Sequence, residues 1–530
     1  MTRPVIITGF WTCACVMGFA ASSHSDDRGE DPAASPQTSV AVVGFENAAD
    51  SDARDHWMPV AFEEILTWRL RRVPGLVAIP TVRLYQARQE LARPDETSPS
   101  WTRAVTLGGA KRQLSGSCSG PPEHVVLKLR LEPTAGDSPP AETTIGPARL
   151  FEVLDQATRW TLARLGVDRV DTKVSEVIFA PPCATPTALE YYAKAIAASR
   201  DRNTRDAVFF VRQALDYDTA LVPAQLFMAQ LELMSSKSRA AASGRLRSVG
   251  MLASTRGDLV SQTQAELAQG LILVQSRSYD AAEKRFRSAL DRARDARDGY
   301  GELAALNNLS DLHLLRCAGP GADLAEAERD AFVQKHLAQA IELQKRALAR
   351  LVALGDGIAQ LPALNKLALT YEQANDDAHA EQMHRRTLAL AQQTGIARSE
   401  ASAWLFLGQW LFRQKRYPDA LQALTSCLKL APEQAARGVH ESLADIHAAM
   451  NHPRESLVEL QKARALVDAS DLSGQLRMLR RIADIQIQLG QTAGAIETLS
   501  DAADTAHALQ LADDEKKIRE RVRVLRAGSP

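Results

Sequence analysis

The chain has 530 residues, which exceeds the usual extent of a single hydrophobic core, so we expect several domains or one long repeat array. Its 63 Lys and Arg residues balance 64 Asp and Glu residues, and the resulting formal net charge of -1 disfavours a nucleic-acid-binding function. Aromatic residues make up only 5% of the chain, while Ala, Leu, Arg and Gln recur, which indicates a mainly helical protein.

The first 23 residues have the pattern of an export signal. Arg3 precedes a long apolar run, and small residues follow before the chain becomes acidic. The apolar run is close to the shortest length that spans a membrane, so residues 1–23 are predicted to be a signal peptide or an uncleaved membrane anchor. Residues 24–38, rich in Asp, Pro, Ala and Ser, are predicted to be a flexible linker. We therefore expect an exported, periplasmic or envelope-associated protein, with a cytoplasmic location as the alternative.

Residues 39–180 have the alternating elements of an α/β domain. Short β-branched runs alternate with segments whose apolar residues recur at helical spacing. This order predicts a mixed sheet covered by helices. The expected strands are 39–45, 76–80, 111–117, 124–131 and 142–145, and the expected helices are 57–72, 81–92, 101–108 and 148–165.

Two segments of this region resemble a known family. The runs VAVVGFENAADSDARDHW and LGGAKRQLSGSCSG, the second followed by HVVLKLRLEPT, are similar to the strand and turn motifs of the TolB-amino-terminal-like (FlgO-like) domain. The chain has Gly44 where that family often has Pro, which we expect to affect only a bulge. The resemblance implies a fold and no chemistry. In that family the domain often precedes helical repeats in bacterial envelope and signalling proteins.

No segment predicts a catalytic or metal site. Residues 116–120, GSCSG, have the outline of a nucleophile elbow around Cys118, but Pro121 and Pro122 follow where a helix is required, so a turn is expected. Histidines five residues apart, such as His379 and His384, do not share a helix face, so no metal ligation is expected. We expect no enzyme activity and no cofactor.

The six cysteines contain no CxxC pair, which argues against a zinc site or a disulfide framework. A bridge between Cys118 and Cys183 stays open for an exported chain. Cys427 occupies a position that favours a small buried side chain, so it is predicted to be a structural thiol.

The stretch from residue 401 to residue 434 resembles one tetratricopeptide repeat. That repeat is a helical hairpin in which a Gly on the first helix and an Ala on the second allow close packing, and a Pro ends the second helix. The residues that carry the resemblance are Trp404, Leu407, Gly408, Ala420, Leu424, Cys427 and Pro432.

The same spacing recurs between residues 185 and 510. Ala282, Phe286 and Ala289 repeat the second-helix pattern, and Leu309-Ser310 and Leu367-Ala368 repeat the first. We predict about eight hairpins forming an all-α superhelix. An insertion near 317–334 is predicted to be a surface loop, and residues 511–530 are predicted to form a capping helix and tail.

Several repeats resemble the longer variant of kinesin light chains, including the first helices with Leu-Asn-Asn-Leu at 306–309 and Leu-Asn-Lys-Leu at 364–367. In that family the groove lined by first helices binds peptides, and Asn amides can both donate to and accept from a peptide group. The alternative is that these polar side chains are merely solvated. By position, the groove residues are predicted to be Asn307, Asn308, Asp311, Asn365, Gln409, Arg413, Glu441 and Asp445.

The sequence as a whole predicts a non-enzymatic scaffold. Its solenoid groove would bind a peptide or helix of a protein partner in a bacterial envelope or signalling assembly. The alternative is a cytoplasmic regulatory or adaptor subunit acting in trans with a kinase or transcription regulator. Membrane contact is expected only through the N-terminal segment, and partner identity and oligomeric state stay open.

Overall fold

The computed structural model describes residues 38–48, 56–91, 101–136, 138–235, 238–319, 325–430 and 433–528. They form two compact units, the first ending at Asp376 and the second beginning at Asp377. The predicted signal segment and nearly all of the predicted linker lie outside the described residues. Within the described ranges, no helix is both long enough and apolar enough to cross a membrane.

The first unit contains a five-stranded mixed sheet with the strand order β2-β1-β3-β4-β5. Strand β1 lies between β2 and β3 and is parallel to both, while β3, β4 and β5 are successively antiparallel. Helical crossovers supply the parallel connections, and tight turns supply the antiparallel ones. The strands are β1 (Thr38–Asn47), β2 (Leu76–Ala78), β3 (Arg112–Ser119), β4 (Val125–Pro133) and β5 (Ala141–Ala148).

Helices cover strand β1 on both faces. Val40 and Val42 belong to a core shared with α1 and α4, and the alternate residues Ala41 and Val43 are also fully buried. Both faces of a strand must be covered when its successive side chains are all apolar. The helices of this region are α1 (Met58–Leu70), α2 (Thr81–Leu91), α3 (Trp101–Leu107), α4 (Leu150–Arg164) and α5 (Thr172–Ile178), of which α5 was not predicted.

Gly44 lies in a bulge of strand β1. The pairing register of β1 with β3 shifts between Val42 and Phe45, and Gly44 has a φ of 75°. Glycine adopts this left-handed conformation without the steric penalty of a side chain. A small mixed sheet within a mainly helical chain is thus observed, while the resemblance to the TolB-amino-terminal-like family stays a prediction.

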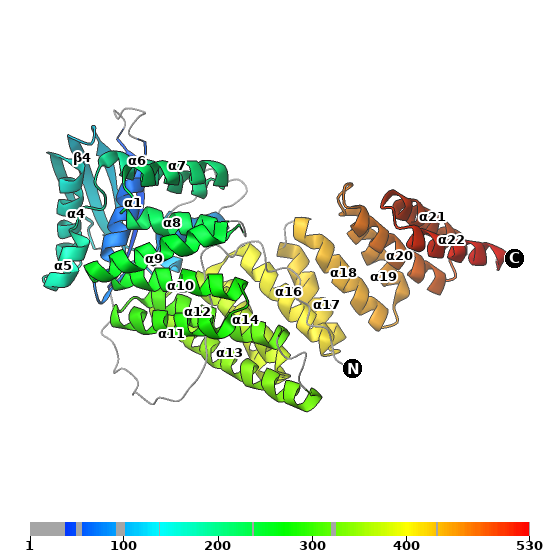
Figure 1. Cartoon of the computed structure of the whole chain (residues 1–530). Helices are drawn as coiled ribbons and strands as arrows, with labels where there is room; N and C mark the ends of the chain where they lie inside the picture. Colours follow the sequence, from blue (N-terminus) through cyan, green and yellow to red (C-terminus); the bar gives the residue numbers. More distant parts are fainter. Residues whose placement is uncertain are drawn as a thin grey trace. The chain divides into compact units, whose positions relative to one another are not determined.

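The rest of the first unit consists of antiparallel helix pairs (Figure 1). In Figure 1 the sheet and its helices lie beside the first of these pairs, and α1 contacts α6. The helices are α6 (Pro186–Arg200) with α7 (Thr204–Tyr217), α8 (Val222–Leu233) with α9 (Arg239–Arg256), α10 (Leu259–Gln275) with α11 (Tyr279–Asp295), α12 (Gly299–Ala318) with α13 (Glu326–Leu354), and finally α14 (Gly357–Gln373).

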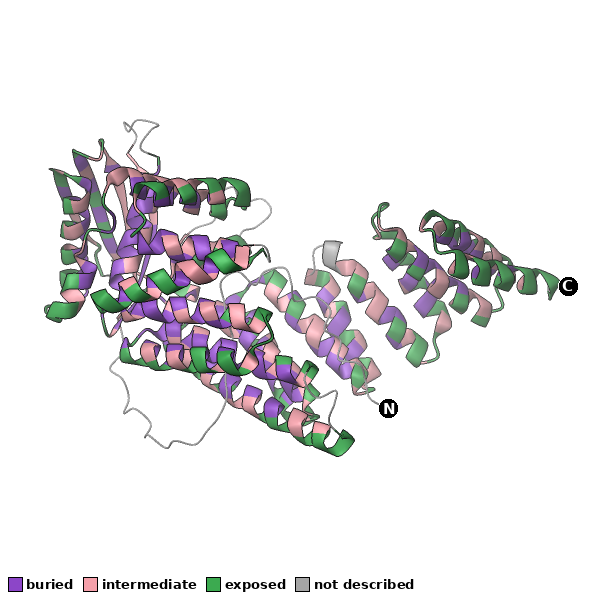
Figure 2. Ribbon diagram, in the orientation of Figure 1, coloured by how far each residue is buried: buried purple, intermediate pink, exposed green. Residues whose placement is uncertain are grey.

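The second unit continues the same type of pairing. Figure 2 shows buried residues where its paired helices meet and exposed residues on their outer faces. The helices are α15 (Asp377–Thr394), α16 (Ala397–Arg413) with α17 (Tyr417–Leu430), α18 (Glu433–Ala449) with α19 (Pro453–Ala465), α20 (Leu472–Gln488) with α21 (Thr492–Ala508), and α22 (Ala512–Ala527).

Close packing within a pair depends on a glycine, as predicted for Gly408. A Cβ atom at Gly408 would lie 2.8 Å from Leu424 of the second helix. Gly270 has the same relation to Phe286, with a distance of 2.2 Å from a Cβ atom to the ring, although the sequence pattern did not single out Gly270. The missing side chain lets the two helix axes approach.

The predicted surface loop near 317–334 is a wrong prediction. α12 continues to Ala318, and α13 begins at Glu326, so most of this segment is helical. The residues from 326 onward are good helix formers. The negative charges of Glu326 and Glu328 in the first turn interact favourably with the positive N-terminal end of the helix dipole. Residues 326–334 therefore lengthen α13, because helix propensity outweighed the interruption of the repeat pattern, while residues 320–324 lie outside the described part of the chain.

The open possibility of a bridge between Cys118 and Cys183 is also excluded. Cys118 and Cys183 form no disulfide with each other, and both are buried in the same core. Cys118 lies within β3, and Gly120, with a φ of 86°, starts the turn to β4, so the predicted turn replaces any nucleophile elbow. Cys427 is 2% exposed, which confirms the predicted buried thiol.

Candidate functional site

The predicted groove residues occupy first helices in both units. The structure places Asn307, Asn308 and Asp311 on α12, Asn365 on α14, Gln409 and Arg413 on α16, and Glu441 and Asp445 on α18.

Asn307 and Asn308 do not lie in an open groove. Their exposed fractions are 2% and 5%, and the side-chain oxygen of Asn307 is buried with no hydrogen-bond partner among the described residues. Nearly every residue in the first half of α12 is buried, so neighbouring elements cover the helix on all sides. The expectation of exposed amides at these two positions is therefore wrong for this structure, and peptide contact would require the covering groups to move.

Asp311 and Asn365 lie closer to solvent. The Asp311 side chain is 45% exposed and forms an ion pair with Lys366 of α14, the residue next to Asn365. Asn365 is half-buried, and its side-chain oxygen has no hydrogen-bond partner in the described part of the chain. The structure thus brings these two predicted residues to neighbouring first helices.

In the second unit, Glu441 is the centre of a charged network between α18 and α20. Its carboxylate oxygens lie 3.1 Å from Arg437, 3.6 Å from Arg477 and 3.7 Å from Arg481. Arg481 also pairs with Asp445. We call these five residues the α18–α20 charged face.

The α18–α20 charged face remains accessible. Glu441 is 21% exposed and Asp445 is 50% exposed. Partial burial raises the pKa of Asp445, and Glu441 raises it further, while Arg481 opposes the shift. On the neighbouring α16, Gln409 is half-buried and Arg413 is exposed. These two positions and the α18–α20 charged face supply side chains of both charges and an amide on successive first helices.

The sequence did not predict a second set of contacts, which are ion pairs between the α/β domain and the solenoid. Arginines of the α/β domain bind aspartates that precede first helices of the solenoid. We call these contacts the interdomain ion pairs, and they are Arg72 with Asp258, Arg71 with Asp298, and Arg83 with Asp356. Each aspartate occupies the N-cap position of its helix, α10, α12 or α14 respectively.

The N-cap position explains why aspartate is used. The Asp258 carboxylate accepts from the backbone N–H of Ser261, and the Asp356 carboxylate accepts from that of Ala359. An N-cap carboxylate accepts hydrogen bonds from backbone N–H groups of the first turn, and the positive end of the helix dipole stabilises its negative charge. The arginine then neutralises a carboxylate that is already fixed in place.

Asp258 and Asp356 each pair with an arginine, but their pKa values shift in opposite directions. For Asp258, burial alone would raise the pKa, but the charge and hydrogen bonds of Arg72 and Ser261 outweigh burial and lower it. For Asp356, burial outweighs the charge of Arg83, and the pKa is raised.

Two further contacts hold the same boundary. Arg200 of α6 donates to Glu63 at 3.0 Å and to Glu64 at 2.9 Å, both on α1. Glu63 also accepts from the backbone N–H groups of Gly44 and Phe45, so this carboxylate joins the β1 bulge to the solenoid. Burial raises the pKa of Glu63, although Arg200 stabilises its charge.

Glycines allow the backbones of the two parts to touch. A Cβ atom at Gly109 would lie 2.2 Å from the carbonyl oxygen of Leu354, and Gly109 has a φ of 87°. The turn after α3 thus sits directly on the turn between α13 and α14. The α/β domain and the solenoid from α6 to α14 form one packed unit, and no linker separates them.

The N-cap role of the interdomain aspartates could have been predicted from the sequence. Each follows a helix end and precedes an apolar helical run, as Gly257-Asp258 and Gly355-Asp356 show. Their arginine partners lie 186 to 273 positions away, so spacing could not pair them. In the described part of the chain, no group of three or more His, Cys, Asp or Glu residues is arranged to hold a metal ion.

No protein-family model matches the chain, and the comparison with curated proteins finds no match. Among solved structures, the apo form of RapI is similar with 12% identity and a TM-score of 0.41, covering 64% of this chain and 99% of RapI. BtubC from P. vanneervenii matches with 14% identity and a TM-score of 0.35 over 45% of this chain and 90% of its own. A tetratricopeptide repeat protein from Parabacteroides merdae matches with 8% identity and a TM-score of 0.32 over 54% and 96%. These matches are partial, so the repeat assignment depends on the helix pairs and glycine contacts described above.

Proposed function

We propose that the chain is a non-enzymatic interaction scaffold that binds a peptide or helix of a protein partner through the first helices of its second unit. The α18–α20 charged face carries this proposal. Its acidic and basic side chains neutralise one another in the free chain, yet they stay partly exposed. A partner with charged side chains can exchange into such pairs, which gives specificity and orientation.

Gln409 extends the proposed binding surface to α16. An amide side chain both donates and accepts hydrogen bonds, so it suits the main chain of a bound peptide. Solenoid repeats present successive helices as a continuous surface, on which an extended partner contacts several repeats at once. Binding to the α18–α20 charged face and to Gln409 would therefore fix the direction of the peptide.

Photo-crosslinking tests this proposal. A photoreactive amino acid at Gln409 should capture a defined partner, and one at Thr425 on the exposed face of α17 should not. Glu441→Arg should abolish the capture at Gln409, because it replaces the carboxylate that pairs with both Arg437 and Arg477 by a third positive charge. Equal capture from both positions, or capture that is insensitive to Glu441→Arg, would exclude the first-helix surface.

We also propose that the scaffold works in a bacterial envelope or signalling assembly after export. The charged residue and apolar run of residues 1–23 support this location. Cell fractionation with N-terminal sequencing tests it, since export predicts a protein outside the cytoplasm. A mature cytoplasmic protein that retains Met1 would instead favour the cytoplasmic regulatory subunit.

A further inference from the structure

The outer face of α7 has an unusual composition for a solvated helix. Ala207, Val211 and Ala214 pack into the core of the first unit, so the opposite side of the helix should be polar. Phe209 nevertheless projects from that side and is 55% exposed. A phenyl ring left in water forgoes the stabilisation that burial of apolar surface would provide, so an exposed ring that is held in place indicates a binding surface.

Neighbouring aromatic rings hold Phe209 in place. Phe209 packs edge-on against Phe210 with ring centres 5.4 Å apart, and Phe210 stacks on Tyr191 of α6 at 6.4 Å. Tyr191 stacks in turn on Tyr217, which is 52% exposed. Aromatic residues are rare in this chain, so four of them on α6 and α7 form a marked local concentration. Rigid aromatic side chains are frequent anchors of protein interfaces.

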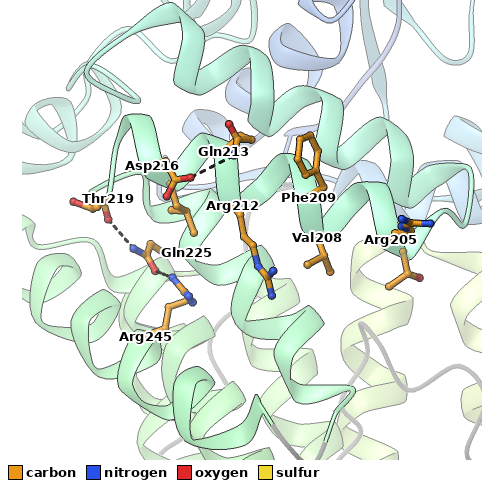
Figure 3. A pocket seen from close by; sticks show the side chains of 11 residues that line it. Arg205, Val208, Phe209, Arg212, Gln213, Asp216, Thr219, Gln225 and Arg245 are labelled. Carbon is orange, nitrogen blue, oxygen red and sulfur yellow. Dashed lines mark hydrogen bonds between the residues drawn. The ribbon is translucent and has the colours of Figure 1, made fainter.

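A cavity of about 740 Å³ lies beside this row, between α7 and the next helix pair. Figure 3 shows Arg212 reaching from α7 toward the helices that carry Gln225 and Arg245. The volume is in the range of peptide and ligand sites. Val208, Phe209 and Leu215 supply its apolar wall.

The cavity is lined by three arginines and one carboxylate, Asp216, so its charged side chains are mainly basic. Arg205 and Arg212 are both exposed, and neither forms an ion pair with a described residue. By contrast, the third arginine of the cavity, Arg245, is bound to Glu232 at 3.0 Å and to Gln225 at 2.7 Å. Arg205 and Arg212 are two helical turns apart on one face of α7, about 10 Å, with the apolar side chains between them.

We infer that this cavity is a second binding site, which takes an acidic amphipathic segment of a protein partner. An apolar side chain of the segment would pack against Val208 and Phe209. Two carboxylates spaced by about two helical turns would pair with Arg205 and Arg212. This site lies in the first unit and shares no residue with the surface proposed above, so each can fail without the other.

Fluorescence polarisation with the full chain tests the inference. The probe is a labelled synthetic helical peptide with a Leu row flanked by Glu residues, compared with one carrying Lys for Glu and one carrying Ala for Leu. The acidic Leu peptide should bind at least about tenfold more tightly than either control, and its affinity should fall with added salt. Equal binding of all three peptides would overturn the inference.

Matched variants locate the binding. Phe209→Ala and Arg212→Glu should each weaken the acidic peptide about tenfold, since both residues are exposed and neither supports the core. Lys284→Glu, a charge reversal on exposed α11, should leave binding unchanged. If Lys284→Glu weakened the binding of the acidic peptide equally, the effect would come from the net charge of the chain and not from this cavity, which would overturn the inference. Self-association of the chain that Phe209→Ala abolishes would identify a second copy as the occupant and overturn the inference.

Discussion

Arg72 of the α/β domain and Asp258 of the solenoid form a buried ion pair, with 2.8 Å between Nη2 and Oδ2 and only 4% of each side chain exposed. Arg72 also donates to Ser261, and its guanidinium lies 3.5 Å from the centre of the Trp68 ring. Every polar group of the aspartate is thus occupied by a fixed partner. The pair joins two parts of the chain that the sequence presents as separate modules.

Removing Arg72 should loosen this boundary. Arg72→Ala leaves Asp258 buried without its counter-charge, which costs about 3–5 kcal/mol. We expect an earlier transition in urea and faster hydrogen exchange in the first turn of α10. Arg130→Ala is the control, because Arg130 pairs with Glu132 and Glu142 on the solvent-exposed surface of β4 and β5, where water screens the charges and the pairs add little to stability. Equal effects of the two variants would contradict a structural role for the buried pair.

Gly109→Ala should separate the two backbones that touch at this boundary. The new methyl group would lie 2.2 Å from the Leu354 carbonyl oxygen, and a φ of 87° is itself strained for alanine. We expect a loss of about 1–3 kcal/mol in unfolding free energy. Gly136→Ala separates the two causes, since Gly136 has a φ of 89° but no atom within 4 Å of the added carbon. A loss as large at Gly136 would attribute the effect to backbone strain alone.

Gly270→Ala should destabilise the α10 and α11 pair. The added carbon would overlap the ring of Phe286, which is fully buried and has no room to move, and overpacking of this kind costs about 1–3 kcal/mol. The double variant with Phe286→Leu should recover part of the loss. Gly438→Ala should instead stabilise by about 1 kcal/mol, because that glycine lies in α18 with open space around it. Thermal unfolding measures this, and the melting temperature should rise from Gly270→Ala to the double variant to Gly438→Ala.

His313 should make the stability of the first unit depend on pH. It is 1% exposed, its Nδ1 lies 2.7 Å from Nδ1 of His336, and burial together with His336 lowers its pKa to about 3. The unfolded chain binds a proton below its ordinary pKa of about 6.5, whereas the folded chain does not. Stability from this residue is therefore present above pH 6.5 and is lost as the pH falls toward 3, by up to about 1.4 kcal/mol per pH unit.

Urea titrations between pH 5 and pH 7 measure this dependence. His313→Leu should flatten the slope, because it removes the group that takes up a proton only on unfolding. His124→Ala should keep the slope of the original chain, since His124 is exposed on the turn before β4. If the unfolding free energy of His313→Leu still fell with decreasing pH as steeply as that of the original chain, the pH dependence would come from titratable groups other than His313.

Local patterns in the sequence predicted the elements well. Helical periodicity and the close approach at Gly408 depend on neighbouring residues along the chain or on one hairpin, so spacing is sufficient to predict them. The error at 317–334 had a local cause as well, because a break in the repeat was given more weight than helix propensity.

The predicted groove residues differ in their exposure to solvent. Asp445 and Arg413 are exposed on first helices, as a groove requires, but Asn307 and Asn308 are buried. A polar residue on the outer face of a helix has the same sequence pattern whether water or another element covers it. The periodicity of α12 therefore could not reveal that its first half is enclosed.

The sequence by itself determined which segments become helices, which helices pair, and where glycine permits their contact, because these properties follow from propensity and periodicity within about forty residues. Only the tertiary structure decided that the α/β domain is packed on the solenoid through Arg71, Arg72 and Arg83. The physical reason is that a buried ion pair is stable only when both charges lose water at the same place, and chain spacing does not record which distant groups meet there.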